Sequence, residues 1–237
     1  MADGEVDVVF LIADLAGYTA LTEAHGGTQA ARVIGRYVEL TEDALRPGVN
    51  LVERVGDELL IVGSEPPAVL ETAIGLRDLI DAEPMFPGVR MGIHGGRVLR
   101  NDGRYYGTAL NLTARLAAHA RPGQLLCSDA MAAVCEARGI PCRGLGPVRF
   151  RNLPLAVAVF EVAMSHPRDA DSAIDPVCRM HVSATTAPAR LPYGGAIHLF
   201  CSFDCARAFA SAPDRFVPPA PMATPTPGTH GETSGGS

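Results

Sequence analysis

The chain has 237 residues, of which 20 are basic and 26 acidic, so its formal net charge is −6. That length is enough for one full domain and a small second one, and the 47% of hydrophobic residues is enough for a real core. The acidic balance argues against a nucleic-acid surface, which needs a basic patch. All twenty basic residues are arginine, which excludes a Walker lysine, a Schiff-base lysine and a lysine base.

The ends and hydropathy of the chain bear on where the protein works. No run approaches the roughly 18 apolar residues that cross a bilayer, and the acidic segment Met1–Glu5 is unlike a signal peptide. We therefore expect a cytoplasmic protein without membrane contact. Thiols stay reduced in that compartment, so the six cysteines indicate core residues or metal ligands rather than disulfides.

The first predicted elements are a buried strand over Val6–Ile12 and two helices within Thr19–Leu45, divided at Gly26-Gly27. The remaining predicted elements are strands over 50–55 and 58–63 joined at Gly56-Asp57, a helix over 67–82, a strand over 89–99 interrupted at Gly95-Gly96, a helix over 108–120, a strand over 124–128, a helix over 129–137, and a closing strand pair over 148–151 and 157–162. A hairpin inside this alternation predicts an α+β fold with a ferredoxin-like core and extra strands.

Composition divides the chain into four segments. We predict a first domain over residues 1–164 and a polar linker over 165–173. A small cysteine-containing α+β module is expected over 174–216. Residues 217–237, rich in Pro, Thr, Gly and Ser, are predicted to be a disordered tail.

Two aspartates stand at chain reversals of the first domain. Asp14 ends a predicted strand before a glycine-bearing turn, and Asp57 lies at the tip of a hairpin. Carboxylates on adjacent strand ends can share Mg²⁺, which prefers hard oxygen ligands and completes its shell with phosphate oxygens. A single aspartate in a turn more often only stabilises that turn, so the interpretation depends on the surrounding sequence.

The surrounding sequence resembles a known family. Phe10–Thr19, Val55–Glu58 and Gly107–Leu116 resemble, in order and spacing, the three signature blocks of class III adenylate/guanylate cyclases, and Arg121–Leu126 matches as well. The resemblance covers residues from about 5 to 163. It implies conversion of ATP or GTP to the 3',5'-cyclic monophosphate and pyrophosphate.

The resemblance also implies a metal site. Asp14 and Asp57 match the metal-binding aspartates of the family, with Mg²⁺ or Mn²⁺ as the ions, and the Leu15 carbonyl matches a backbone metal ligand. One ion would activate the ribose 3'-hydroxyl and the other would hold the triphosphate, which is the two-metal arrangement of in-line phosphoryl displacement.

Substrate contacts follow from the same match. The turn Gly17, Tyr18 and Thr19 leads into a helix, so its N–H groups can meet phosphates. Asn111 and Arg115 match the pair that orients the ribose and stabilises the pentavalent phosphate, and their spacing of four places both on one helix face. Because family active sites form between two such domains, the resemblance implies a homodimer.

The base-selecting positions depart from the family pattern. Glu53 stands where adenylate cyclases typically carry Lys and guanylate cyclases Glu, and Arg104 stands where Asp, Thr or Cys is usual. A carboxylate and a guanidinium are compatible with guanine and also with adenine. Glu53 and Arg104 could instead form an ion pair with each other and make no contact with the base. Arg54 could also compete for the base-binding site. The base therefore stays undecided.

The C-terminal segment carries a second resemblance. Asp175–Met180, Tyr193–Gly195, Phe200–Cys205 and Pro213–Phe216 resemble a YHS domain in order and spacing. Its thiols are candidate ligands for Zn²⁺ or Cu⁺, with His198 or His181 as a fourth ligand; the three cysteines are Cys178, Cys201 and Cys205. Alternatively, they are small buried hydrophobes. Cys127, Cys135 and Cys142 fall outside this pattern and are expected to be core residues or incidental.

Three functions are compatible with these observations. The leading hypothesis is an active cyclase whose output responds to a metal or redox state sensed by the C-terminal module. The alternative is a weak or inactive cyclase-fold regulator that binds nucleotide or a partner cyclase chain. A third option makes metal handling by the cysteine segment the main function. Replacement of Asp57 by Ala separates the first two, because only an enzyme would lose product formation.

Overall fold

The computed structural model describes residues 4–163 and 171–217. Most of the predicted linker and nearly all of the predicted tail lie outside these residues. An eight-stranded mixed sheet has the order β2-β3-β1-β4-β6-β8-β7, with β5 paired to β4. Its strands are β1 Gly4–Leu15, β2 Val49–Val55, β3 Glu58–Gly63, β4 Val89–Asn101, β5 Arg104–Tyr106, β6 Leu125–Ser128, β7 Cys142–Val148 and β8 Val157–Val162. The α+β expectation is confirmed.

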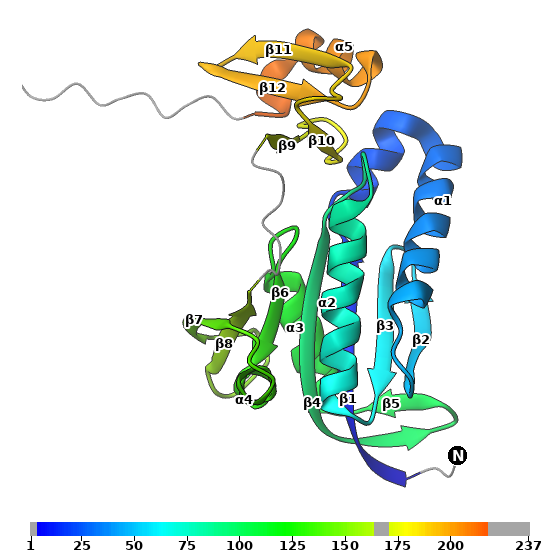
Figure 1. Cartoon of the computed structure of the whole chain (residues 1–237), viewed down its shortest axis with the longest axis vertical. Coiled ribbons are helices and arrows are strands. Elements are labelled where there is room, and N and C mark those ends of the chain that lie inside the picture. Colours follow the sequence, from blue (N-terminus) through cyan, green and yellow to red (C-terminus); the bar gives the residue numbers. More distant parts are fainter. Residues whose placement is uncertain (1–3, 164–170, 218–237) are drawn as a thin grey trace, which may run out of the picture.

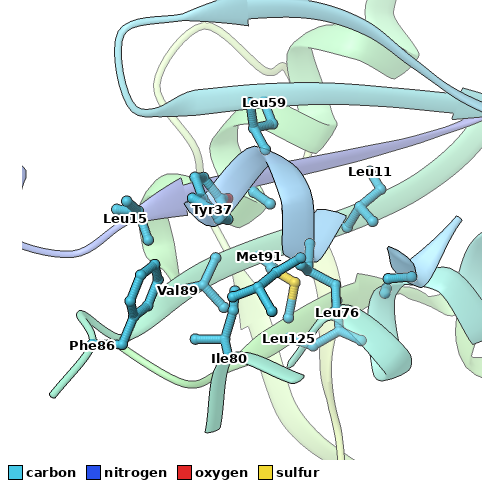
Figure 2. Packing of buried hydrophobic residues seen from close by; sticks show 14 of the residues in the cluster. Leu11, Leu15, Tyr37, Leu59, Leu76, Ile80, Phe86, Val89, Met91 and Leu125 are labelled. Carbon is cyan, nitrogen blue, oxygen red and sulfur yellow. The ribbon is translucent and has the colours of Figure 1, made fainter. Parts of the chain in front are cut away.

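Helices cover both faces of this sheet (Figure 1). The helices are α1 Tyr18–Ala44, α2 Pro66–Ala82, α3 Thr108–His119 and α4 Asp129–Ala137. Strand β1 alternates between the two cores: Val9 and Leu11 belong to the cluster beneath α1 and α2, whereas Phe10 packs with Val98 and Ala109 on the α3 side. Figure 2 shows the larger cluster, in which Tyr37, Leu59 and Met91 lie among other buried side chains.

A close approach of α3 to the sheet depends on Gly92. A Cβ atom there would lie 2.4 Å from the Ala117 nitrogen and 2.6 Å from the Thr113 carbonyl oxygen, both backbone atoms. Only glycine therefore allows this contact. The face of α3 that packs inward is made of its buried residues, Ala109, Thr113, Leu116 and Ala117.

Two expected boundaries differ from the structure. Strand β4 runs without a break through Gly95-Gly96, because the long neighbouring strand β1 pairs with it continuously from Gly4↔Arg100 to Leu15↔Val89. The first strand of the closing pair is Cys142–Val148 rather than 148–151, since its ladder with β8 runs from Cys142↔Val162 to Val148↔Val157. By contrast, the predicted break at Gly26 is present, because that residue has the non-helical angles φ 78° and ψ 165°.

The C-terminal module consists of two small hairpins and a helix. These elements are β9 Ser172–Ile174, β10 His181–Ser183, β11 Ala189–Tyr193, β12 Ala196–Phe200, α5 Phe203–Ser211 and a 3₁₀ turn over Pro213–Arg215. Cys178 and Phe209 belong to the same buried cluster as Phe86 and Val89 of the first domain. The His181 N–H also donates to the Phe86 carbonyl at 3.1 Å. The module is thus packed onto the first domain (Figure 1).

None of the described helices combines the length and the apolar composition that a membrane span requires.

Candidate functional site

Acidic side chains converge at the end of β1. Cross-strand register places Asp14 beside Glu58 on β3 and beside Arg90 on β4. The hairpin tip brings in Asp57, whose carbonyl accepts from the Leu15 N–H at 3.4 Å. The Arg90 guanidinium forms an ion pair with the Asp14 carboxylate. The structure thus brings together the two aspartates predicted as metal ligands and adds Glu58 and Arg90 to them.

Negative charge is concentrated in this carboxylate cluster, defined as Asp14, Asp57 and Glu58. Burial raises the pKa of Asp14, Arg90 lowers it, and the neighbouring Asp57 carboxylate raises it again, with a net rise. Burial, then Asp14 and Asp57, likewise raise the pKa of Glu58. The buried Tyr37 hydroxyl near these carboxylates has no hydrogen-bond partner among the described residues. Crowded hard oxygen donors with one neighbouring arginine fit a divalent cation such as Mg²⁺.

The predicted phosphate-binding turn begins immediately after the cluster. Gly17 is the residue preceding α1 and has φ +88°, a left-handed conformation that glycine adopts freely. The first N–H groups of a helix have no partners within it, so Tyr18 and Thr19 stand where an anion can be bound. The Arg179 side chain of the C-terminal module covers this turn, since a Cβ on Gly17 would lie 2.4 Å from the Arg179 Cβ.

The predicted ribose and phosphate pair lies apart from the carboxylate cluster. Asn111 and Arg115 are both exposed on α3, on the face that does not pack against β4. Within residues 4–163 and 171–217, no hydrogen bond or ion pair joins either of them to Asp14 or Asp57. The described part of one chain therefore shows no direct contact between the Asn111–Arg115 pair and the two aspartates.

The two candidate base-reading residues line one cavity. Glu53 and Arg104 bound a space of about 420 Å³ together with Leu60, Tyr105 and other residues of β2, β5 and α3. In the described part of the chain these two residues form no ion pair with each other. Arg54 does not line the cavity; its guanidinium donates instead to the Gly56 carbonyl at 3.3 Å.

A second cluster lies where the module meets α1. Cys178, Cys201, Cys205 and His25 place their ligand atoms within 4.8 Å of one another. Neither histidine proposed from the sequence joins this group; the His198 Nε2 instead lies 3.3 Å from the Tyr193 carbonyl oxygen. His25 comes from the first domain, immediately before the break at Gly26. We call these four residues the thiol–imidazole cluster.

The other three cysteines also lie together. Cys127, Cys135 and Cys142 have ligand atoms within 4.8 Å of one another. Cys127 and Cys135 are fully buried in the hydrophobic core, as expected. Hydrogen bonding from Cys127 lowers the pKa of Cys135 to about 6.

Glu58, Arg90 and His25 are the site residues that sequence reasoning missed. Glu58 directly follows Asp57 in the sequence, and its pairing with Asp14 comes from the β1–β3 register. Arg90 follows the start of an apolar strand run, and only the β1–β4 register reveals its ion pair with Asp14. One sequence feature could have drawn attention to His25: it lies at the end of a helical segment, just before Gly26-Gly27. No spacing rule links it to cysteines more than 150 positions away.

Comparisons with known proteins find relatives of both parts of the chain. A family model for the YHS domain matches residues 173–220. The "pH-sensitive adenylate cyclase MT1302" of Mycobacterium tuberculosis is 30% identical over 163 residues, covering 67% of this chain and 41% of that protein. An "Adenylate cyclase" of Glutamicibacter nicotianae is 34% identical over 122 residues, covering 51% of this chain and 30% of that protein. The chain thus spans less than half the length of these relatives.

Solved structures show the same fold. An adenylate cyclase from Trypanosoma brucei in its monomeric state superimposes with a TM-score of 0.63 at 20% identity, covering 69% of this chain and 92% of the other. The adenylyl cyclase CyaB from P. aeruginosa gives 0.61 at 21% identity, covering 72% and 100%. The chain therefore contains a class III nucleotide cyclase catalytic domain followed by a C-terminal YHS domain.

Proposed function

We propose that the protein is a purine nucleotide cyclase that converts ATP or GTP to the 3',5'-cyclic monophosphate and pyrophosphate. The observation that carries this proposal is the carboxylate cluster at the end of β1, directly beside the N-terminus of α1. Metal-binding oxygens and a phosphate-binding helix end therefore lie side by side in one chain. The names of the sequence relatives, adenylate cyclases, support the same activity.

The residues divide the chemistry between them. Asp14 and Asp57 would hold Mg²⁺ or Mn²⁺, with the Leu15 carbonyl as a further ligand. The bound ion supplies positive charge to the triphosphate and to the attacking ribose hydroxyl. The N–H groups of the Gly17 turn bind phosphate oxygens. Arg115 stabilises charge on the transferring phosphate, because its guanidinium is always charged and planar.

A second copy of the chain would complete each site. Asn111 and Arg115 point to solvent rather than to the carboxylate cluster of their own chain. Exposed hydrophobic side chains on β2, β4 and β5 support an interface there; they are Val52, Val55, Leu99 and Tyr106. A symmetric homodimer would bring the Asn111–Arg115 half of each chain to the carboxylate half of the other.

The cavity between β2 and β5 would hold the purine base. Glu53 can accept hydrogen bonds from guanine N1–H and N2–H₂ or from adenine N6–H₂, and Arg104 can donate to ring nitrogens or to guanine O6. Both triphosphates thus suit the donor set, and only product analysis chooses between them. With Glu53→Lys, we expect GTP turnover to fall more than ATP turnover, because the guanine acceptor is removed.

Complementation between two inactive variants tests this function and the dimer together. Asp57→Asn and Arg115→Ala should each be inactive alone, with cyclic AMP and cyclic GMP measured in the presence of Mn²⁺. Co-expressed at equal levels they should recover roughly a quarter of the wild-type rate, since half the dimers are mixed and each carries one intact site. No recovery would contradict the shared site.

The wild-type protein tests the activity itself. If it forms no cyclic nucleotide from either triphosphate, the enzyme proposal is wrong. Retained nucleotide or partner binding in that case would favour the regulator interpretation.

A further inference from the structure

The thiol–imidazole cluster has the dimensions of a metal shell. Distances between ligand atoms are 3.4 Å for Cys178 Sγ–Cys201 Sγ, 3.7 Å for Cys201 Sγ–Cys205 Sγ, and 3.3 and 3.5 Å from His25 Nε2 to the Cys201 and Cys205 sulfurs. Tetrahedral zinc, about 2.3 Å from sulfur and 2.0–2.1 Å from nitrogen, sets neighbouring ligand atoms roughly 3.5–3.8 Å apart. Four of the six ligand–ligand distances thus lie close to those of a zinc tetrahedron, and the other two, from Cys178 to Cys205 and to His25, are within 4.8 Å.

Local structure holds these ligands in place. The fully buried Asp175 carboxylate accepts from the Val177 and Cys178 N–H groups at 2.8 and 3.4 Å, and from the Cys201 N–H at 2.8 Å. It thus ties together the two loops that carry Cys178 and Cys201. The Ser202 hydroxyl accepts from the Cys205 N–H at 3.1 Å and caps α5. Such preorganisation favours a bound ion over incidental contact between thiols.

The donor set favours zinc. Three thiolates and one imidazole form a closed four-ligand shell, the usual coordination of structural Zn²⁺. Cys178 and Cys205 are buried, while Cys201 and His25 are half-buried. Four protein ligands fill a tetrahedral shell, whereas a catalytic zinc ion keeps one position for water or substrate.

The origin of the fourth ligand has a structural consequence. The cysteines belong to the C-terminal module, but His25 belongs to α1, whose first residues follow the Gly17 turn. Arg179, next to Cys178, has φ +68° and lies with its Cβ and Cγ over Gly17. Coordination by His25 would therefore fasten the module to the helix segment that starts at the phosphate-binding turn.

We propose that Cys178, Cys201, Cys205 and His25 form an interdomain Zn²⁺ site that latches the C-terminal module onto α1 and holds Arg179 against the Gly17 turn. The zinc site stands independently of the cyclase reaction. Its influence on catalysis rests on the proposed function, because it acts through the turn that would bind the triphosphate.

Metal content of the full-length protein tests the site. Purified under reductant and loaded with zinc alone, the wild type should hold about one Zn²⁺ per chain, and X-ray absorption should show a shell of three sulfurs and one nitrogen. His25→Gln should lose the nitrogen and release zinc to a chelator faster, whereas the matched control His198→Gln should match the wild type. The proposal would be overturned if only His198→Gln lost zinc, or if both variants retained zinc as the wild type does. It would also be overturned if the wild type bound no zinc.

Hydrogen exchange tests the latch without using activity. Zinc removal or His25→Gln should speed amide exchange in residues 17–25 and 177–180, while exchange in α3 stays unchanged. Equal exchange with and without zinc at those segments would overturn the latch, even if zinc is bound. Absence of cyclase activity alongside a normal zinc shell and a zinc-dependent exchange pattern would instead count only against the proposed function.

Discussion

The carboxylate cluster and the thiol–imidazole cluster lie at the two ends of the first segment of α1, yet they differ in almost every physical respect. Asp14 and Asp57 are half-buried oxygen donors held by strand register and a hairpin tip. The thiol–imidazole cluster joins loops of one domain to a helix of another, with sulfur as its main donor. Hard and soft donors thus distinguish two candidate ion sites at the two ends of one short helix segment.

The comparison shows how an open site differs from a closed one. The carboxylate cluster has fewer protein ligands than Mg²⁺ requires, so water and triphosphate oxygens must complete its shell. The ion pair with Arg90 holds the Asp14 carboxylate in place and reduces its repulsion with the neighbouring carboxylates. The thiol–imidazole cluster supplies four ligands from a single chain. A tetrahedral ion held by all four would have no coordination position left for a substrate. Exchangeable binding suits catalysis, whereas saturated binding suits a structural or regulatory role.

The largest expected effect separates the two clusters by activity. Asp57→Asn should lower cyclase activity by at least about a hundredfold, since metal charge stabilisation contributes several kcal/mol. Its zinc content should equal that of the wild type. The exposed α1 substitution Asp43→Asn is the matched control and should leave both measurements unchanged. Loss of zinc in Asp57→Asn would show that the two sites are not independent.

Thermal unfolding should distinguish the clusters by stability. Zinc removal with a strong chelator should lower the melting temperature by several degrees, since about 1 kcal/mol corresponds to 2–4 °C for a chain of this size. Omitting Mg²⁺ should change the melting temperature far less, because that ion would bind at an open and partly hydrated site. Calorimetry of the full-length protein measures both. An equal shift on removing either ion would contradict the distinction.

The contact between the clusters can be broken at Gly17. Gly17→Ala should destabilise the protein by about 1–3 kcal/mol, because alanine is strained at φ +88° and its Cβ would overlap the Arg179 side chain. Arg179→Gly in the same chain should restore part of that loss by removing the overlap, with the strain remaining. Urea unfolding of the single and double variants measures the coupling. Additive losses would mean that the two side chains do not interact.

The smallest effect concerns a titrating group outside both clusters. Burial lowers the pKa of His94, whose Nδ1 lies 2.7 Å from the Ser128 hydroxyl, with Asp129 raising it in part. A lowered pKa means that the unfolded chain takes up the proton first, so stability should decline as pH falls below about 6.5. His94→Gln should flatten this decline. An unchanged slope, measured by urea unfolding between pH 7 and pH 5, would assign it to other groups.

Much of the architecture follows from local sequence. Short strand-like runs mark β2 and β3, the Gly56-Asp57 pair marks their turn, and Gly26 breaks α1 where expected. The predicted interruption of the strand at Gly95-Gly96 was wrong. Pairing with β1 along the whole of β4 keeps that strand intact, and such long-range pairing leaves no local signal.

The sequence by itself determined the chemistry available to this protein: no lysine, two aspartates at chain reversals, an Asn111–Arg115 pair on one helix face, and three cysteines in one short module. Only the tertiary structure decided which of these groups meet. Strand register delivers Arg90 to Asp14, and docking of the module delivers His25 to the thiols. Residue spacing constrains neighbours within one helix or turn, whereas contacts between elements are set by packing of the whole core.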